Sequence, residues 1–126
     1  MGAHRNVGLS ELPLRGISIN PEAGDVSAIT VVASDSGVMF INKETGNSCT
    51  YTLPAVADGT GKMFWFLNAQ DTKSTIINAP TSTMMMANMA TASTATSAGD
   101  IGECGFVVCD GTNYYFFEIY GTWASA

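Results

Sequence analysis

The chain has 126 residues, enough for one domain with one hydrophobic core. It is 46% hydrophobic but only 13% charged, about half the charged share of an average globular domain. This composition excludes an intrinsically disordered chain. The net charge is −6, with three lysines against ten acidic residues after position 20. Because an acidic domain repels phosphate backbones, we expect no nucleic-acid partner.

The low charge density predicts a protein whose surface is largely covered by other chains, since solubility of a free monomer depends on charged side chains. The alternative is a monomer with a polar, uncharged surface rich in Ser, Thr and Asn. No apolar run approaches the ~18–20 residues that span a bilayer, so we expect no membrane association. The N-terminus lacks the apolar core of a signal peptide, and three cysteines are too few for a disulfide scaffold. These features favour a protein that is made and used without secretion.

The first 28 residues differ in pattern from the rest of the chain. Prolines at positions 13 and 21 and four glycines interrupt them, and their Leu and Ile residues follow neither a helical nor a strand period for long. We therefore predict an extended N-terminal arm over residues 1–28, held by its own domain or by a neighbouring chain.

Residues 29–126 are predicted to form the folded domain, from short β-type runs separated by turn residues. The runs lie at 28–33, 38–41, 48–53, 62–69, 74–79, 105–109 and 114–120. Seven or eight short strands at about ten-residue spacing predict an all-β fold, an antiparallel β-sandwich or barrel of jelly-roll-like type. No internal repeat is apparent.

Several segments carry more specific expectations. The run at 62–69 is apolar on both faces, which predicts a strand buried on both sides. Residues 81–99 favour strand or loop over helix because of their threonine content, and the methionines from Met84 to Met89 fit either an oligomer interface or core packing. Asp110-Gly111 predicts a hairpin between the last two long strands.

The residues offer little for catalysis. The only histidine, His4, lies in the arm, so a Ser-His-Asp or Cys-His site cannot form on the domain. A carboxylate pair could serve a glycosidase, but the acidic residues occupy turn positions, with Glu118 the exception. We therefore predict that the chain is not an enzyme and has no catalytic residue.

Metal and cofactor sites are not predicted either. Cys104 and Cys109 lack the spacing and the histidines of a zinc site, and on one strand their side chains would point to opposite faces. The favoured interpretation is that they are small buried hydrophobic residues. The aromatic strand at 114–120 fits the core, although it could also form a stacking platform for sugars.

Four short motifs resemble those of small β-proteins of tailed phages. They are Val32-Ala-Ser-Asp-Ser-Gly37, Tyr51-Thr-Leu-Pro54, Phe64-Trp-Phe66 and Val107-Val-Cys-Asp-Gly-Thr-Asn-Tyr-Tyr115. The family that they resemble is that of capsid decoration (cement) proteins, and related domains occur in tail-fibre modules. The resemblance covers roughly residues 30–123 and leaves the arm outside.

The resemblance implies a homotrimer on the outer surface of the virion, which binds the major capsid protein and stabilises the head by bridging neighbouring capsomers. In that setting the arm supplies the capsid or subunit contacts. The residues expected to make them are Arg5, Leu9, Leu12, Leu14, Arg15, Ile17 and Ile19. The alternative is a tail-fibre or adhesin-type module that binds a host glycan; a small hydrolase with a carboxylate pair is the second rival.

Overall fold

The computed structural model describes residues 14–20, 26–87 and 89–126 of the protein. Two β-sheets and two short helical turns account for the regular structure of these residues. The helical turns are η1 (Ala33–Asp35) and α1 (Val56–Gly59). The strands are β1 (Gly16–Ile19), β2 (Ala28–Thr30), β3 (Val38–Asn42), β4 (Cys49–Thr52), β5 (Met63–Asn68), β6 (Thr75–Asn78), β7 (Met84–Met86), β8 (Met89–Ala92), β9 (Thr94–Ser97), β10 (Cys104–Cys109), β11 (Tyr114–Tyr120) and β12 (Trp123–Ser125).

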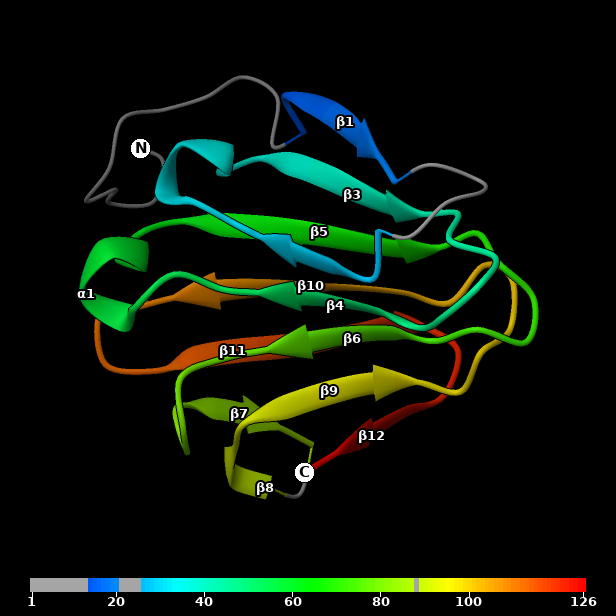
Figure 1. Ribbon diagram of the computed structural model, residues 1–126. Helices are drawn as coiled ribbons and strands as arrows, with labels where there is room; N and C mark the ends of the chain where they lie inside the picture. The colour runs from blue at the N-terminus through cyan, green and yellow to red at the C-terminus, as the bar shows by residue number, and fades with distance from the viewer. Residues whose placement is uncertain (1–13, 21–25, 88) are drawn as a thin grey trace, which may run out of the picture.

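The first six strands alternate between the two sheets and form a parallel solenoid. Strands β1, β3 and β5 lie side by side in parallel in the seven-stranded sheet, and β2, β4 and β6 do the same in the five-stranded sheet. Each coil therefore places one strand in each layer and stacks on the next (Figure 1). Ile17 is paired with Met39, twenty-two residues later, and Met39 with Trp65, twenty-six residues later.

The second half of the chain completes both sheets mainly by antiparallel pairing. The seven-stranded sheet has the order β1-β3-β5-β10-β11-β7-β8, and the five-stranded sheet has the order β12-β9-β6-β4-β2. Antiparallel pairs join β5 to β10, β10 to β11, β6 to β9 and β9 to β12. The coils thus stack from β1 and β2 at one end toward β8 and β12 at the other (Figure 1).

The all-β prediction is confirmed, but the antiparallel jelly-roll arrangement is wrong for the first half of the domain. Apolar alternation sets which side of a strand is buried, and it carries no information on whether the neighbouring strand runs parallel or antiparallel. Runs spaced by about ten residues fit successive strands of one antiparallel sheet, and they fit equally the two strands of one solenoid coil. The expectation of no internal repeat is also corrected, because the coils themselves are the repeat.

The described part of the predicted arm belongs to this solenoid. Residues 16–19 form β1, the first strand of the seven-stranded sheet, and β2 runs from Ala28 to Thr30 across the predicted boundary at residue 28. Residues 1–13 and 21–25 lie outside the described residues.

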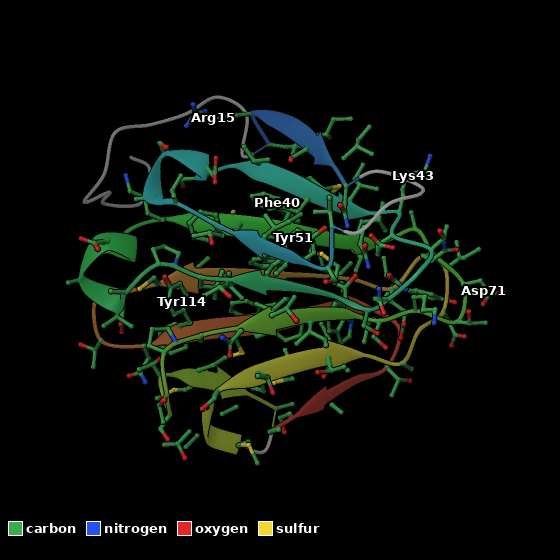
Figure 2. The ribbon with its side chains drawn as sticks, viewed as in Figure 1. Arg15, Phe40, Lys43, Tyr51, Asp71 and Tyr114 are labelled. Atoms are coloured by element: carbon green, nitrogen blue, oxygen red, sulfur yellow. The ribbon has the colours of Figure 1, made fainter. Side chains whose placement is uncertain are left out.

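The core lies between the two sheets. Phe40, Tyr51 and Phe66 form a ring cluster with centroids 5.4–5.6 Å apart, and Figure 2 shows Phe40 and Tyr51 between the two layers. Tyr114 is fully buried, and its hydroxyl donates to the Pro54 carbonyl at 2.6 Å. Aromatic side chains from both sheets therefore fill the interior.

Two local predictions concern strands of the second half, and a third concerns β5. The 81–99 region contains strands β7, β8 and β9, as favoured over helix, and Met84 and Met86 are buried in the core. The Asp110-Gly111 hairpin is confirmed, since β10 and β11 pair on either side of it. The Asp110 carboxylate accepts hydrogen bonds from the Tyr115 hydroxyl and from the Asn113 and Thr112 N–H groups. These bonds, that of Tyr115 most of all, lower the pKa of Asp110 to about 2. The prediction that the strand at 62–69 is buried on both sides is wrong, because one face of β5 is only half-buried.

Candidate functional site

The outer faces of the two sheets differ in chemistry. The outer face of the five-stranded sheet is dominated by hydroxyl and amide side chains. One row across it runs through Thr30, Thr52, Asn78 and Thr94 on adjacent strands. Such side chains remain solvated without charge, so this face fits exposure to water.

The outer face of the seven-stranded sheet is apolar. Its side chains form three rows across the strands, and these rows together make up the outer apolar face. They contain Ile17, Met39, Trp65, Phe106 and Phe117; Ile19, Ile41, Leu67, Cys104 and Tyr120; and Met63, Val108, Tyr115 and Met85. None of these side chains is charged.

Aromatic rings form the centre of this face. The Trp65 and Phe106 centroids are 4.8 Å apart, and Phe106 stacks on Phe117 at 4.7 Å with an interplanar angle of 15°. The Trp65 indole N–H is buried and has no hydrogen-bond partner in the described ranges, although a buried indole usually finds one. Because the rings pack against one another, this row is a rigid surface.

The margins of the outer apolar face are the most exposed parts. Ile17 and Ile19 on β1 are 57% and 55% exposed, and Phe117 and Tyr120 on β11 are 47% and 66% exposed. The rows span six strands, about 24 Å at the usual strand spacing, and cover an area on the order of 500 Å². This area is at the upper end of the ~300–600 Å² covered by the largest apolar patch of a typical monomer, and such patches are often functional.

The predicted contact residues divide into two groups. Arg5, Leu9 and Leu12 lie outside the described residues. Leu14 and Arg15 are exposed just before β1, where the Arg15 guanidinium donates to the Ser36 carbonyl at 3.0 Å (Figure 2). Ile17 and Ile19 lie at the edge of the outer apolar face, so these two belong to the candidate binding surface.

A second feature is a ladder of buried asparagines at one corner of the solenoid. Asn20, Asn42 and Asn68 end the three successive strands of the seven-stranded sheet and are 2%, 0% and 0% exposed. The Asn20 Nδ2 donates to Asn42 Oδ1, and the Asn42 Nδ2 to Asn68 Oδ1, each at 3.2 Å. Stacked asparagines of this kind satisfy each other along the direction of stacking.

The two ends of this ladder differ. The Asn68 Nδ2 closes the corner by donating to the carbonyls of Gln70, Lys73 and Asp100 at 2.9–3.0 Å. At the opposite end, Asn20 Oδ1 is buried and has no hydrogen-bond partner among the residues that the structure describes. The ladder is therefore complete at β5 and open at β1.

Two buried carboxylates hold turns. Glu103 is 1% exposed and accepts N–H bonds from Ala98, Gly99, Asp100 and Thr122 at 2.7–3.1 Å. Burial alone would raise the pKa of Glu103, but these four hydrogen bonds outweigh it and lower the pKa.

The second buried carboxylate is Glu44. It accepts the Gly46 N–H at 2.7 Å through Oε1, while its Oε2 has no hydrogen-bond partner within residues 14–20, 26–87 and 89–126. The sequence pattern indicates only a turn position for Glu44, and it marks neither Glu44 nor Glu103 as buried.

The described residues bring together no cluster of three or more potential metal ligands among His, Cys, Asp and Glu. Glu118, the one acidic residue singled out within a strand, is exposed on β11. Cys104 and Cys109 lie on opposite sides of β10, as predicted, with Cys109 buried and Cys104 half-buried on the outer apolar face. All three cysteines are free.

The sequence does contain a signal for the solenoid. Asn20-Pro-Glu-Ala-Gly24 and Asn42-Lys-Glu-Thr-Gly46 share the pattern Asn-x-Glu-x-Gly twenty-two residues apart, each after an isoleucine. This interval equals the spacing between stacked strands β1 and β3. A short motif that recurs at the length of one coil is the sequence signature of a solenoid.

No protein-family model, no curated protein and no solved structure matches this chain. Across the described ranges, no helix is long and apolar enough to cross a membrane. A function therefore has to be inferred from two features of the molecule, the outer apolar face and the open asparagine ladder.

Proposed function

We propose that this chain is a phage capsid decoration protein, which binds the outer capsid surface as a homotrimer and stabilises the head by bridging neighbouring capsomers. The observation that supports the proposal most is the uncharged outer apolar face on one sheet, opposite a hydroxyl-rich face on the other. This asymmetry fits a protein with one covered side and one solvated side.

The chemistry of the outer apolar face suits binding alone. Its side chains include no nucleophile, acid or base beyond the half-buried Cys104 thiol and the tyrosine hydroxyls. A specific interface buries ~800 Å² on each partner, and the face provides on the order of 500 Å² of that from side chains on rigid strands. Three copies in a trimer would combine such contacts through effective concentration.

The alternative is a tail-fibre or adhesin-type module that binds a host glycan. The row of Trp65, Phe106 and Phe117 supports it, because sugars stack on aromatic rings. The rings of this row pack on each other at 4.7–4.8 Å, which leaves fewer free ring faces for a sugar. Capsid decoration is therefore the preferred proposal.

The test uses heads of the encoding phage that were assembled without this chain. Purified protein is first sized by light scattering and then added to the heads. We expect a trimer that saturates the heads, and we expect Phe117→Lys to lower occupancy at least tenfold while the protein stays folded. The matched control is Thr52→Lys, at an exposed position of the hydroxyl-rich face, which should bind normally.

Two outcomes would contradict the proposal. One is a monomer that leaves the heads undecorated. The other is an unchanged occupancy for Phe117→Lys, which would show that the outer apolar face is not used. Binding on a glycan array that is lost in Phe117→Lys would instead favour the adhesin-type alternative.

A further inference from the structure

We infer that the edge of β1 that faces away from β3 is an acceptor site for one additional strand, supplied by an extended segment of another protein that carries an asparagine. The inference goes beyond the proposed function, because it concerns the edge of the seven-stranded sheet and not its outer face. It starts from the buried, unpaired Asn20 Oδ1.

The ladder defines which group is missing at this atom. Within it, Asn20 and Asn42 each donate their Nδ2 to the Oδ1 of the asparagine in the next coil. No side chain in the described part of the chain donates to the Oδ1 of Asn20. A preceding coil would supply that donor from an amide side chain in the same register. A buried acceptor without a partner costs about 1–3 kcal/mol, so filling it would favour binding.

The backbone of β1 is arranged to receive a strand at the same place. The Asn20 N–H donates to the Ile41 carbonyl in β3 at 2.9 Å. Backbone groups alternate between the two edges of a strand, so those of Ile17 and Ile19 face away from β3. In the described residues β1 pairs with no strand other than β3. An edge of this kind accepts extended segments by main-chain hydrogen bonding.

The register of the existing coils specifies the partner. The residues that stack on Ile17 are Met39 and Trp65, those on Ile19 are Ile41 and Leu67, and those on Asn20 are Asn42 and Asn68. Each of these strands reads apolar-x-apolar-Asn. The fitting segment therefore runs parallel to β1, has an asparagine opposite Asn20, and extends the outer apolar face by two apolar side chains.

A second copy of the chain that pairs its own β1 with this edge about a two-fold axis does not fit the site as well. A two-fold contact between two β1 strands would be antiparallel, and it would set Asn20 of one copy opposite the start of β1 in the other. The amide donor would then be out of register with the open acceptor. A segment of a different protein can run parallel to β1 and place an asparagine opposite Asn20.

The probe is a capped peptide with the sequence of residues 37–43, Gly-Val-Met-Phe-Ile-Asn-Lys, which is the strand that β1 already pairs with on its other side. Its binding to the full chain is followed by NMR. We expect saturable shifts and slowed hydrogen exchange at the Ile17 and Ile19 amides. The peptide with Asn42→Asp lacks the N–H donor and should bind about tenfold more weakly.

Variants of the protein separate edge pairing from other contacts. Ile17→Pro removes an N–H that faces the free edge and leaves the bonds to β3 in place, which edge strands tolerate. The Ile17→Pro variant should no longer bind the peptide. The Ile17→Thr variant, which keeps the N–H, should still bind it. The outer-face variant Phe117→Lys should bind the peptide normally, so failure of the proposed function would leave this result unchanged.

Three outcomes would overturn the inference. The first is equal binding of the two peptides, and the second is shifts confined to the outer apolar face. The third is strong protection of the Ile17 and Ile19 amides in the full chain before any peptide is added. Such protection would mean that residues 1–13 or a second copy already occupy the edge.

Discussion

The Asn42 side chain donates to the Asn68 side chain at 3.2 Å, across strands β3 and β5. The two residues are twenty-six positions apart, and both are fully buried. Asn42 also accepts the Glu44 N–H and donates toward the Thr75 hydroxyl at 3.1–3.2 Å. The middle amide of the ladder thus joins three stretches of chain in a buried polar network.

Asn42→Leu should strongly destabilise the fold. The substitution keeps the volume but removes both the donor and the acceptor, which leaves buried groups on Asn20, Glu44 and Asn68 with fewer partners. Asn20 Nδ2 keeps its bond to the Val26 carbonyl and Asn68 Oδ1 keeps the Thr75 hydroxyl, whereas the Glu44 N–H loses its acceptor. Because an unsatisfied buried group costs about 1–3 kcal/mol, we expect a loss of about this size. Chemical denaturation measures it.

The control is Asn47→Leu, at an exposed position of the same corner, which should change the free energy of unfolding by less than about 0.5 kcal/mol. If both variants lose the same free energy of unfolding, the buried ladder contributes no more to stability than an exposed asparagine does.

Most strands of this fold could be predicted from the sequence, because burial on one side sets an alternating pattern that needs no knowledge of neighbours. The β10–β11 hairpin is local as well, since Asp110 binds the Thr112 and Asn113 N–H groups within its own turn. The alternating pattern of a strand and the turn of a hairpin are each set by residues that lie close together in the sequence.

The stacking of the coils was not predictable in the same way. Asn20, Asn42 and Asn68 each look like an ordinary turn residue at the end of a strand, and only the register between coils makes them a ladder. The apolar outer side of β5 fits a buried strand equally well, because a sequence does not distinguish a face covered by its own chain from one left for a partner.

Glu103→Gln should destabilise the protein by about 2–3 kcal/mol. Each carboxylate oxygen of Glu103 accepts two backbone N–H groups, and the amide nitrogen of glutamine would set a donor against two of them. The unfolding free energy from denaturant titration at neutral pH measures the loss. Glu118→Gln, at an exposed position, is the matched control and should have little effect.

The same residue predicts how stability depends on pH. The pKa of Glu103 is lower in the folded chain than its ordinary value of 4.5, so the folded state binds its proton more weakly. The contribution of Glu103 is therefore complete above that ordinary value and is lost as pH falls through the lower folded pKa. Unfolding curves across this acidic range should be less pH-dependent in Glu103→Gln than in the unaltered protein. Parallel curves would contradict the role given to the four N–H bonds.

Gly105→Ala should destabilise the fold by about 1–3 kcal/mol through overpacking. A Cβ at Gly105 would lie 2.5 Å from the Phe116 ring and 2.9 Å from the Phe117 carbonyl oxygen, and the carbonyl cannot move without disturbing the pairing of β10 with β11. Gly16→Ala in β1 is the control, because no atom of the described residues lies within 4 Å of its added Cβ. It should be neutral or slightly stabilising. Thermal unfolding of the two variants side by side decides the question.

Cys104 should be the thiol that reacts first in the folded protein, and its reaction should report on the outer apolar face. It is half-buried there, whereas Cys49 and Cys109 are buried in the core. Burial raises the pKa of all three thiols, that of Cys49 to about 11. We therefore expect slow alkylation at Cys104 alone near neutral pH, faster alkylation as the pH rises, and labelling of Cys49 only after unfolding.

Mass spectrometry of digested samples locates the label, and Cys104→Ser should abolish native-state labelling. Labelling of Cys49 at the same rate as Cys104 would contradict the burial described for the two thiols, and protection of Cys104 on decorated heads would place the outer apolar face at the contact.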